Sequence, residues 1–104
     1  MREFSAKQLQ EYLKDNSPFL LDVRQSWEYD ICHLEKSTLI SMSQVPTELD
    51  KLDKERETVV ICHHGIRSRM IGRYLENAGF NNVINLSGGV DEWAKTVDSQ
   101  MPTY

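Results

Sequence analysis

The sequence lacks the features that mark secreted, membrane-spanning and disulfide-stabilised proteins. Its 104 residues contain only two cysteines, Cys32 and Cys62, which are too few for a disulfide framework. The segment after Met1 is polar and has no apolar signal core, and no apolar run approaches the length of a membrane-spanning helix. These absences predict a cytoplasmic protein with reduced thiols and no membrane partner.

An excess of positive charge is also missing. Twelve lysines and arginines stand against 16 acidic residues, and the formal net charge is -4. Because an acidic surface repels nucleic-acid phosphates at long range, we expect no nucleic-acid partner. No repeat or Gly/Ser linker divides the chain, and its length suits one core. We therefore predict a single domain over residues 1–104.

Short apolar runs alternate along the chain with segments of helical periodicity. Such runs are typical of strands that are covered on both faces of a parallel sheet. We predict strands at residues 19–23, 38–40, 58–61 and 83–86. We predict helices over residues 5–14, 70–78 and 90–97, and a short helix opened by Pro46. The alternation predicts an α/β fold with a mainly parallel sheet.

Two details support the helix predictions. Ser5 and Gln8 have the spacing of a capping box, and Gly79 stands where a left-handed residue would end the second helix. The apolar residues of that helix are spaced as one stripe, which we expect to be core: Met70, Ile71, Tyr74, Leu75 and Ala78.

The segment Cys62-His63-His64-Gly65-Ile66-Arg67-Ser68 joins a predicted buried strand to a predicted helix. Open α/β folds bind ligands at this carboxyl edge of the sheet. A loop that enters a helix N-terminus directs backbone N–H groups inward, and with the helix dipole they favour an anion. With Cys62 at the floor of this pocket, we expect its pKa to be lowered and its sulfur to be nucleophilic.

The other loop residues have candidate roles in substrate binding. Gly65 lets the backbone turn closely around the sulfur. Arg67 can place a fixed positive charge near a bound anion, and Ser68 can cap the helix or donate a hydrogen bond to bound sulfur or oxygen. His63 and His64 are either exposed loop residues or take part in substrate binding or proton handling.

The loop resembles the active-site loop of the rhodanese family, in which cysteine, four intervening residues and arginine surround a persulfide. Further similarity to the family lies in residues 20–24, Glu28, Tyr29, His33 and Leu34, and in residues 86–90 with Trp93. The resemblance covers nearly the whole chain. It implies a three-layer α/β fold with a mainly parallel five-stranded sheet flanked by helices.

The resemblance also implies an activity, that of a thiosulfate sulfurtransferase. Cys62 would take a sulfane sulfur from thiosulfate, a persulfide or a polysulfide, hold it as a persulfide, and pass it to a small thiol or protein acceptor. The reaction implies no metal and no organic cofactor. A thiolate nucleophile with loop N–H groups around the persulfide anion suits this chemistry.

Three alternatives use the same residues. A rhodanese-like module could bind a partner or sense redox state without catalysis. Cysteine phosphatases and arsenate reductases also hold an anion in a loop that runs from cysteine to arginine. Their loop has five residues between cysteine and arginine, whereas four residues separate Cys62 from Arg67. A zinc site built from the nearby cysteines and histidines, Cys32, His33, Cys62, His63 and His64, lacks the usual ligand spacing, so we expect none.

Residues outside the loop are assigned structural roles. Cys32 could resolve an oxidised Cys62, but we favour packing beside a short helix. We expect Asp22 and Arg24 to fix neighbouring loops through hydrogen bonds, with Glu28 as a further partner. Charged residues 50–57 should form a solvated face, and residues 101–104 should fray.

Overall fold

The computed structural model describes residues 1–104 and contains one five-stranded sheet in which every strand pair is parallel. The strand order is β1-β5-β4-β2-β3. The strands are β1 (Arg2–Phe4), β2 (Phe19–Asp22), β3 (Thr38–Leu39), β4 (Thr58–Ile61) and β5 (Val83–Leu86). The helices are α1 (Ala6–Tyr12), α2 (Ser26–Ile31), α3 (Val45–Glu48), α4 (Ile66–Asn77) and α5 (Gly89–Thr96), and a 3₁₀ turn spans Leu49–Lys51. The predicted α/β fold is confirmed.

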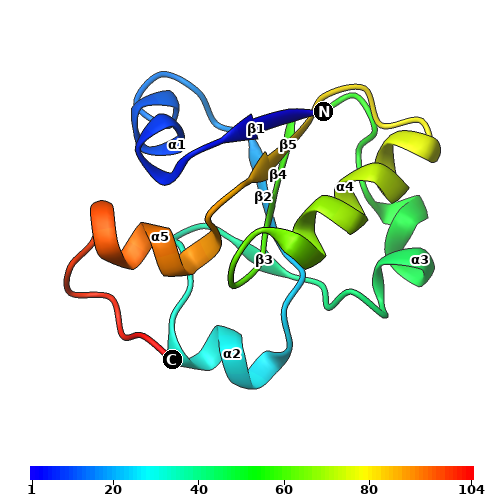
Figure 1. Cartoon of the computed structure of the whole chain (residues 1–104). Coiled ribbons are helices and arrows are strands. Elements are labelled where there is room, and N and C mark those ends of the chain that lie inside the picture. Colours follow the sequence, from blue (N-terminus) through cyan, green and yellow to red (C-terminus); the bar gives the residue numbers. More distant parts are fainter.

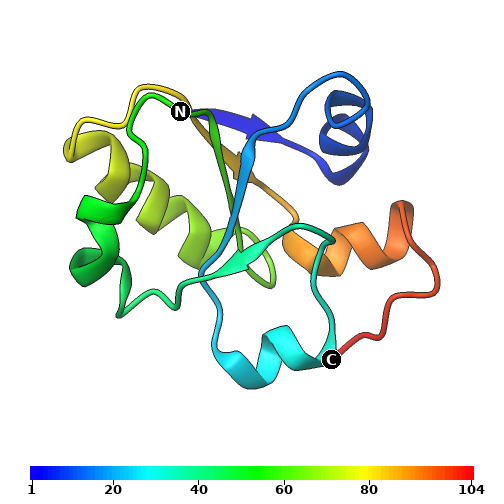
Figure 2. The same ribbon diagram turned by 180° about the vertical axis from the view of Figure 1, so that it is seen from behind.

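Helices cover both faces of the sheet. Helices α1 and α5 lie on one side and α3 and α4 on the other, as Figure 1 and the reverse view in Figure 2 show. Each side has its own buried cluster of apolar residues. Because side chains alternate along a strand, Val59 and Ile61 join the cluster beneath α1 and α5, whereas Val60 and Cys62 join the cluster beneath α4. None of the helices combines the length and the hydrophobicity that a membrane-spanning segment needs.

The four predicted strands are present, and the capping box of Ser5 and Gln8 is formed at the start of α1. Strand β1 was not predicted. It pairs with β5 at the edge of the sheet, and its burial pattern is exposed at Arg2 and Glu3. An edge strand with one half-buried residue, Phe4, has no apolar run to reveal it.

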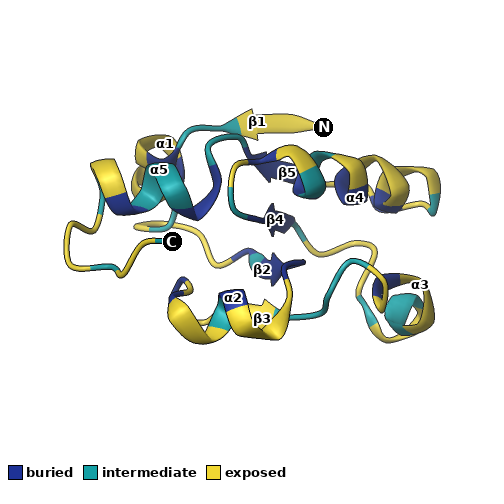
Figure 3. Ribbon diagram, turned by 60° about the horizontal axis from the view of Figure 1, so that its bottom comes forward, coloured by how far each residue is buried: buried dark blue, intermediate teal, exposed yellow.

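The expected core stripe of α4 is partly wrong. Ile71 and Leu75 are buried, but Met70 and Tyr74 are 57% and 39% exposed. The helix packs only one face on the sheet, and its outer face remains exposed, as the yellow segments of α4 in Figure 3 illustrate. The predicted stripe was therefore wider than the buried face. Gly79 follows the helix with a φ of +98°, as predicted.

Candidate active site

The site lies at the carboxyl edge of the sheet, where β4 passes through a short loop into α4 (Figure 1). Strands β2 and β5 flank β4, so the segments that follow all three strands meet at this edge. Cys62 directly follows β4 and is 1% exposed. Cys62 lies at the carboxyl edge of the sheet, as predicted, because a buried strand precedes it and a helix follows it.

The Cys62 sulfur accepts two backbone hydrogen bonds from the loop. The Gly65 N–H lies 3.1 Å from Sγ and the Ser68 N–H lies 3.3 Å from it. Because α4 begins at Ile66, these donors surround the N-terminus of the helix, where the first N–H groups have no partner within the helix. The sulfur therefore occupies the end of α4 that favours negative charge.

Two glycines allow this close packing. Gly65 has a φ of +94°, and a Cβ atom there would lie 2.0 Å from the Ser87 carbonyl oxygen. Gly89 has a φ of +62°, and its Cβ would lie 2.2 Å from the His63 carbonyl oxygen. The start of α5 also holds the loop directly, because the Val90 N–H donates to the Cys62 carbonyl at 3.0 Å. The loop is thus fixed on the segment that follows β5.

Ser68 connects the sulfur to Asn85, a buried residue of β5 that the sequence analysis did not identify. The Asn85 amide nitrogen donates to the Gly65 carbonyl at 3.2 Å and to Glu3 at 2.8 Å. The Asn85 oxygen therefore faces Ser68 and accepts from its hydroxyl at 2.5 Å. The Ser68 oxygen, 3.3 Å from Sγ, is left to accept from the Cys62 thiol. The hydroxyl does not cap α4, so that expectation is wrong, and the role of Ser68 toward a bound sulfur or oxygen stays a prediction.

Arg67 forms a bidentate ion pair with Glu28 of α2. Nη1 lies 2.8 Å from Oε1, and Nη2 lies 2.9 Å from Oε2. The Glu28 side chain is 5% exposed and the Arg67 side chain 35% exposed. Hydrogen bonding to Arg67 lowers the pKa of Glu28 to about 2, despite its burial. The charge of Arg67 is therefore balanced by the Glu28 carboxylate. From the sequence, Glu28 was expected to be a partner of Asp22 and Arg24.

Asp22 and Arg24 form a fully buried ion pair, with Nη2 2.7 Å from Oδ2. Arg24 also donates to the Cys32 carbonyl at 2.6 Å, and so ties the end of β2 to the end of α2. The Glu28 group that it contacts is the backbone carbonyl, at 3.4 Å. Cys32 is 7% exposed and belongs to the apolar cluster beneath α1 and α5. These contacts agree with the structural roles expected for Asp22, Arg24 and Cys32.

The two loop histidines have different environments. The ring of His63 is half-buried between His64, with centroids 3.9 Å apart, and Tyr104, at 4.0 Å. Burial lowers the pKa of His63, and the neighbouring His64 lowers it further. His64 is exposed, and Asp91 lies close enough to both histidines to complete a group of three potential metal ligands. Asp91 already pairs with Lys95 at 2.9 Å, and the group contains neither cysteine of the zinc site considered above.

Residues 101–104 were expected to fray, but Tyr104 is hydrogen-bonded to the site. The Tyr104 hydroxyl donates to Glu28 at 2.7 Å and accepts from Arg24 at 2.9 Å. The sequence offers no local signal for this contact, because Tyr104 lies 76 residues from Glu28 along the chain.

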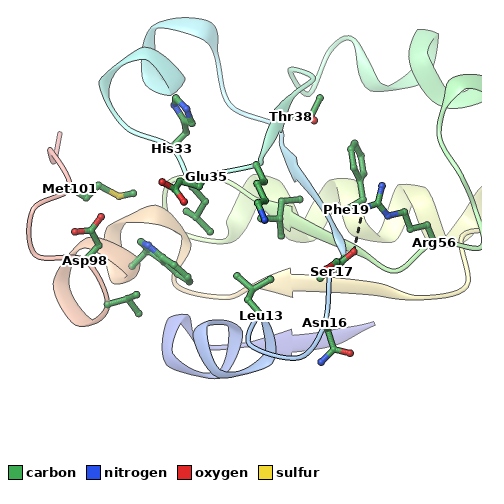
Figure 4. A pocket seen from close by; sticks show the side chains of 16 residues that line it. Leu13, Asn16, Ser17, Phe19, His33, Glu35, Thr38, Arg56, Asp98 and Met101 are labelled. Carbon is green, nitrogen blue, oxygen red and sulfur yellow. Dashed lines mark hydrogen bonds between the residues drawn. The ribbon is translucent and has the colours of Figure 1, made fainter.

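A cavity of about 670 Å³ is separate from the loop. Figure 4 shows its lining, which includes Leu13, Phe19 and Arg56 on one side and His33 and Met101 on the other. None of residues 62–68 lines it. The position of Cys62 and its hydrogen bonds therefore define the candidate active site better than cavity size does.

Comparison with known proteins reveals a consistent set of similarities. The family described as "Rhodanese-like domain" matches residues 5–96. The thiosulfate sulfurtransferase GlpE of Coxiella burnetii is 30% identical over 92 residues, which cover 88% of this chain and 86% of that protein. The adenylyltransferase and sulfurtransferase uba4 of Ogataea parapolymorpha is 33% identical over 90 residues, 85% of this chain. This chain spans only 23% of the length of uba4.

A solved structure supports the same grouping. The crystal structure of a rhodanese-like domain protein from Staphylococcus aureus matches with a TM-score of 0.82 and 28% identity. The match covers 89% of this chain and 91% of the other. It confirms the predicted arrangement of sheet and helices.

Proposed function

Because this chain belongs to the rhodanese-like domain family, we propose that it is a thiosulfate sulfurtransferase in which Cys62 carries the transferred sulfur. The observation that carries the proposal is the placement of the Cys62 sulfur, which accepts hydrogen bonds from the Gly65 and Ser68 N–H groups at the start of α4. A buried sulfur held by backbone donors is suited to alternate between thiolate and persulfide anions.

In the first half-reaction, the Cys62 thiolate attacks the sulfane sulfur of the donor. With thiosulfate, a new S–S bond forms to Cys62, the bond to the sulfonate sulfur breaks, and sulfite leaves with the electron pair. The product is a Cys62 persulfide anion. In the second half-reaction, a thiolate or cyanide attacks the outer sulfur, and Cys62 leaves as the thiolate. Electrons and atoms balance without an added oxidant or cofactor.

The loop offers further donors to the outer sulfur. The N–H groups of Ile66 and Arg67 belong to the first turn of α4, where helices leave backbone donors without internal partners. Four residues separate Cys62 from Arg67, so the loop is tighter than the five-residue phosphate loops of cysteine phosphatases. A tight ring of donors favours a single sulfur atom over a tetrahedral oxyanion. The Arg67 side chain would attract the sulfonate end of thiosulfate.

The decisive experiment compares the wild type with Cys62→Ser and Cys32→Ser in thiosulfate-to-cyanide sulfur transfer. Intact mass spectrometry after incubation with thiosulfate detects one added sulfur. We expect turnover and the adduct in the wild type and in Cys32→Ser, and neither in Cys62→Ser. If the wild type forms no adduct with thiosulfate or polysulfide, the proposal fails, and a binding or redox-sensing role becomes the better interpretation.

A further inference from the structure

Tyr104 joins the two ion pairs of the site through one hydroxyl group. The hydroxyl donates to Glu28 Oε2 at 2.7 Å and accepts from Arg24 Nη1 at 2.9 Å. Glu28 in turn holds Arg67, and Arg24 is held by the buried Asp22. The hydroxyl therefore lies between a rigid, buried pair and the pair that reaches the active-site loop.

The ring of Tyr104 has a second contact with the site. It stacks on His63, the residue after Cys62, with centroids 4.0 Å apart and planes 14° from parallel. Trp27 of α2 packs edge-on against the same tyrosine ring, with centroids 5.7 Å apart and ring planes at 74°. A residue from the C-terminal segment thus contacts both the loop and the helix that supplies the partner of Arg67.

The protonation of Tyr104 suits a donor. Burial first, and then the hydrogen bond to Glu28, raise the pKa of Tyr104 to about 12, although the hydrogen bond from Arg24 acts in the opposite direction. The hydroxyl therefore keeps its proton while Glu28 is a carboxylate, from about pH 2 to about pH 12. Since Arg67 is 35% exposed and its side chain is long, its position depends on how firmly Glu28 is held.

We propose that Tyr104 is a positioning residue for anionic sulfur donors. Its hydroxyl fixes the Glu28 carboxylate, which holds the Arg67 guanidinium in place. Its ring stacks on His63 and fixes that residue of the Cys62 loop. The effect on donor affinity rests on the proposed function. The positioning of Arg67 does not depend on that function. It can be measured with any anionic reagent that reacts with Cys62.

The structure supplies a matched control in Tyr12. Its hydroxyl donates to the Glu57 carboxylate at 2.6 Å, and its ring packs edge-on against Phe4 at 5.2 Å. Tyr12→Phe therefore removes a hydroxyl-to-carboxylate bond like the one from Tyr104 to Glu28, but beside Glu57, which precedes β4, whereas the Cys62 loop follows that strand. Tyr104→Phe retains the ring that stacks on His63 and removes only the hydroxyl.

The experiment compares the alkylation rates of Cys62 with iodoacetate, an anion, and iodoacetamide, its neutral analogue. Peptide mapping separates Cys62 from Cys32. We expect the iodoacetate-to-iodoacetamide ratio to fall roughly threefold or more in Tyr104→Phe, which is the scale of losing the hydrogen bond to Glu28, and to be unchanged in Tyr12→Phe. The KM for thiosulfate should rise by a similar factor in Tyr104→Phe, with little change in kcat.

Thermal unfolding of both variants separates positioning from simple anchoring of the C-terminal segment. If Tyr104→Phe lowers the melting temperature but leaves the alkylation ratio unchanged, Tyr104 is only a structural anchor and the proposal is overturned. If the wild type transfers no sulfur but the ratio falls in Tyr104→Phe, the positioning role stands and the sulfurtransferase proposal alone fails.

Discussion

Arg67 and Glu28 lie 39 residues apart in the chain but form two parallel hydrogen bonds, of 2.8 and 2.9 Å. The pair joins α4, which starts at the Cys62 loop, to α2, which follows β2. The carboxylate is nearly buried, whereas the guanidinium is about one-third exposed. Arg67 therefore has a structural role toward Glu28 and a side that an anion can reach.

These two roles of Arg67 can be separated by mutation. Arg67→Gln leaves the Glu28 carboxylate buried without its cation, so we expect the free energy of unfolding to fall by about 1–3 kcal/mol. The double variant Arg67→Gln/Glu28→Gln removes both charges and should regain most of that loss. Both variants should raise the KM for thiosulfate by roughly tenfold, because each lacks the cation.

Urea unfolding and steady-state kinetics on the same three proteins provide the measurement. Recovery of thiosulfate KM together with stability in the double variant would contradict a role for the Arg67 charge in donor binding.

The Glu28 carboxylate should make stability depend on acid pH. Its pKa is lowered from an ordinary value of 4.5 to about 2 in the folded protein, chiefly by Arg67. A group with a lowered folded pKa stabilises the fold above its unfolded pKa, and this contribution is lost as pH falls from 4.5 toward 2. Unfolding curves of wild type and Glu28→Gln across that interval should converge at its acid end. Parallel curves would show that Glu28 does not supply this dependence.

Gly65 and Gly79 provide a matched pair for the geometry of the loop. Both have a left-handed φ, +94° and +98°, but a Cβ at Gly65 would lie 2.0 Å from the Ser87 carbonyl, whereas at Gly79 the nearest atom is 3.8 Å away. Gly79→Ala should cost only the backbone strain, about 1–2 kcal/mol, and retain the persulfide adduct. Gly65→Ala should cost about 3 kcal/mol or more and abolish the adduct.

Urea unfolding and adduct mass spectrometry decide between these outcomes. Equal stability losses in the two variants would mean that the clash with Ser87 is relieved by movement of the loop.

Asn85 offers a test of the hydrogen bonds behind the sulfur. Asn85→Asp keeps the acceptor for Ser68 but removes the donor to the Gly65 carbonyl, and it places a second carboxylate beside Glu3. We expect a loss of about 1–3 kcal/mol of stability. Iodoacetamide alkylation of Cys62 should slow severalfold, because a buried negative charge disfavours an anionic sulfur nearby. Asn81→Asp, which alters an exposed amide bound to Glu55, is the control and should leave the alkylation rate unchanged.

The sequence by itself determined the elements whose signals are local. The apolar runs at residues 19–22, 58–61 and 83–86 specify buried strands, and a strand followed by a Gly-containing loop and a helix specifies where Cys62 lies. The family resemblance rests on the same contiguous residues. Strand β1 was missed because exposed Arg2 and Glu3 leave only Phe4 half-buried at the sheet edge.

Only the tertiary structure decided which distant residues complete the site. Glu28, Asn85 and Tyr104 come from α2, β5 and the C-terminal segment, and the side-chain partners described above lie between 17 and 82 residues away. These contacts depend on the strand order, which brings the carboxyl ends of β2, β4 and β5 together at one edge. Side-chain partners across that edge follow from packing in three dimensions, and no periodicity along the chain encodes them.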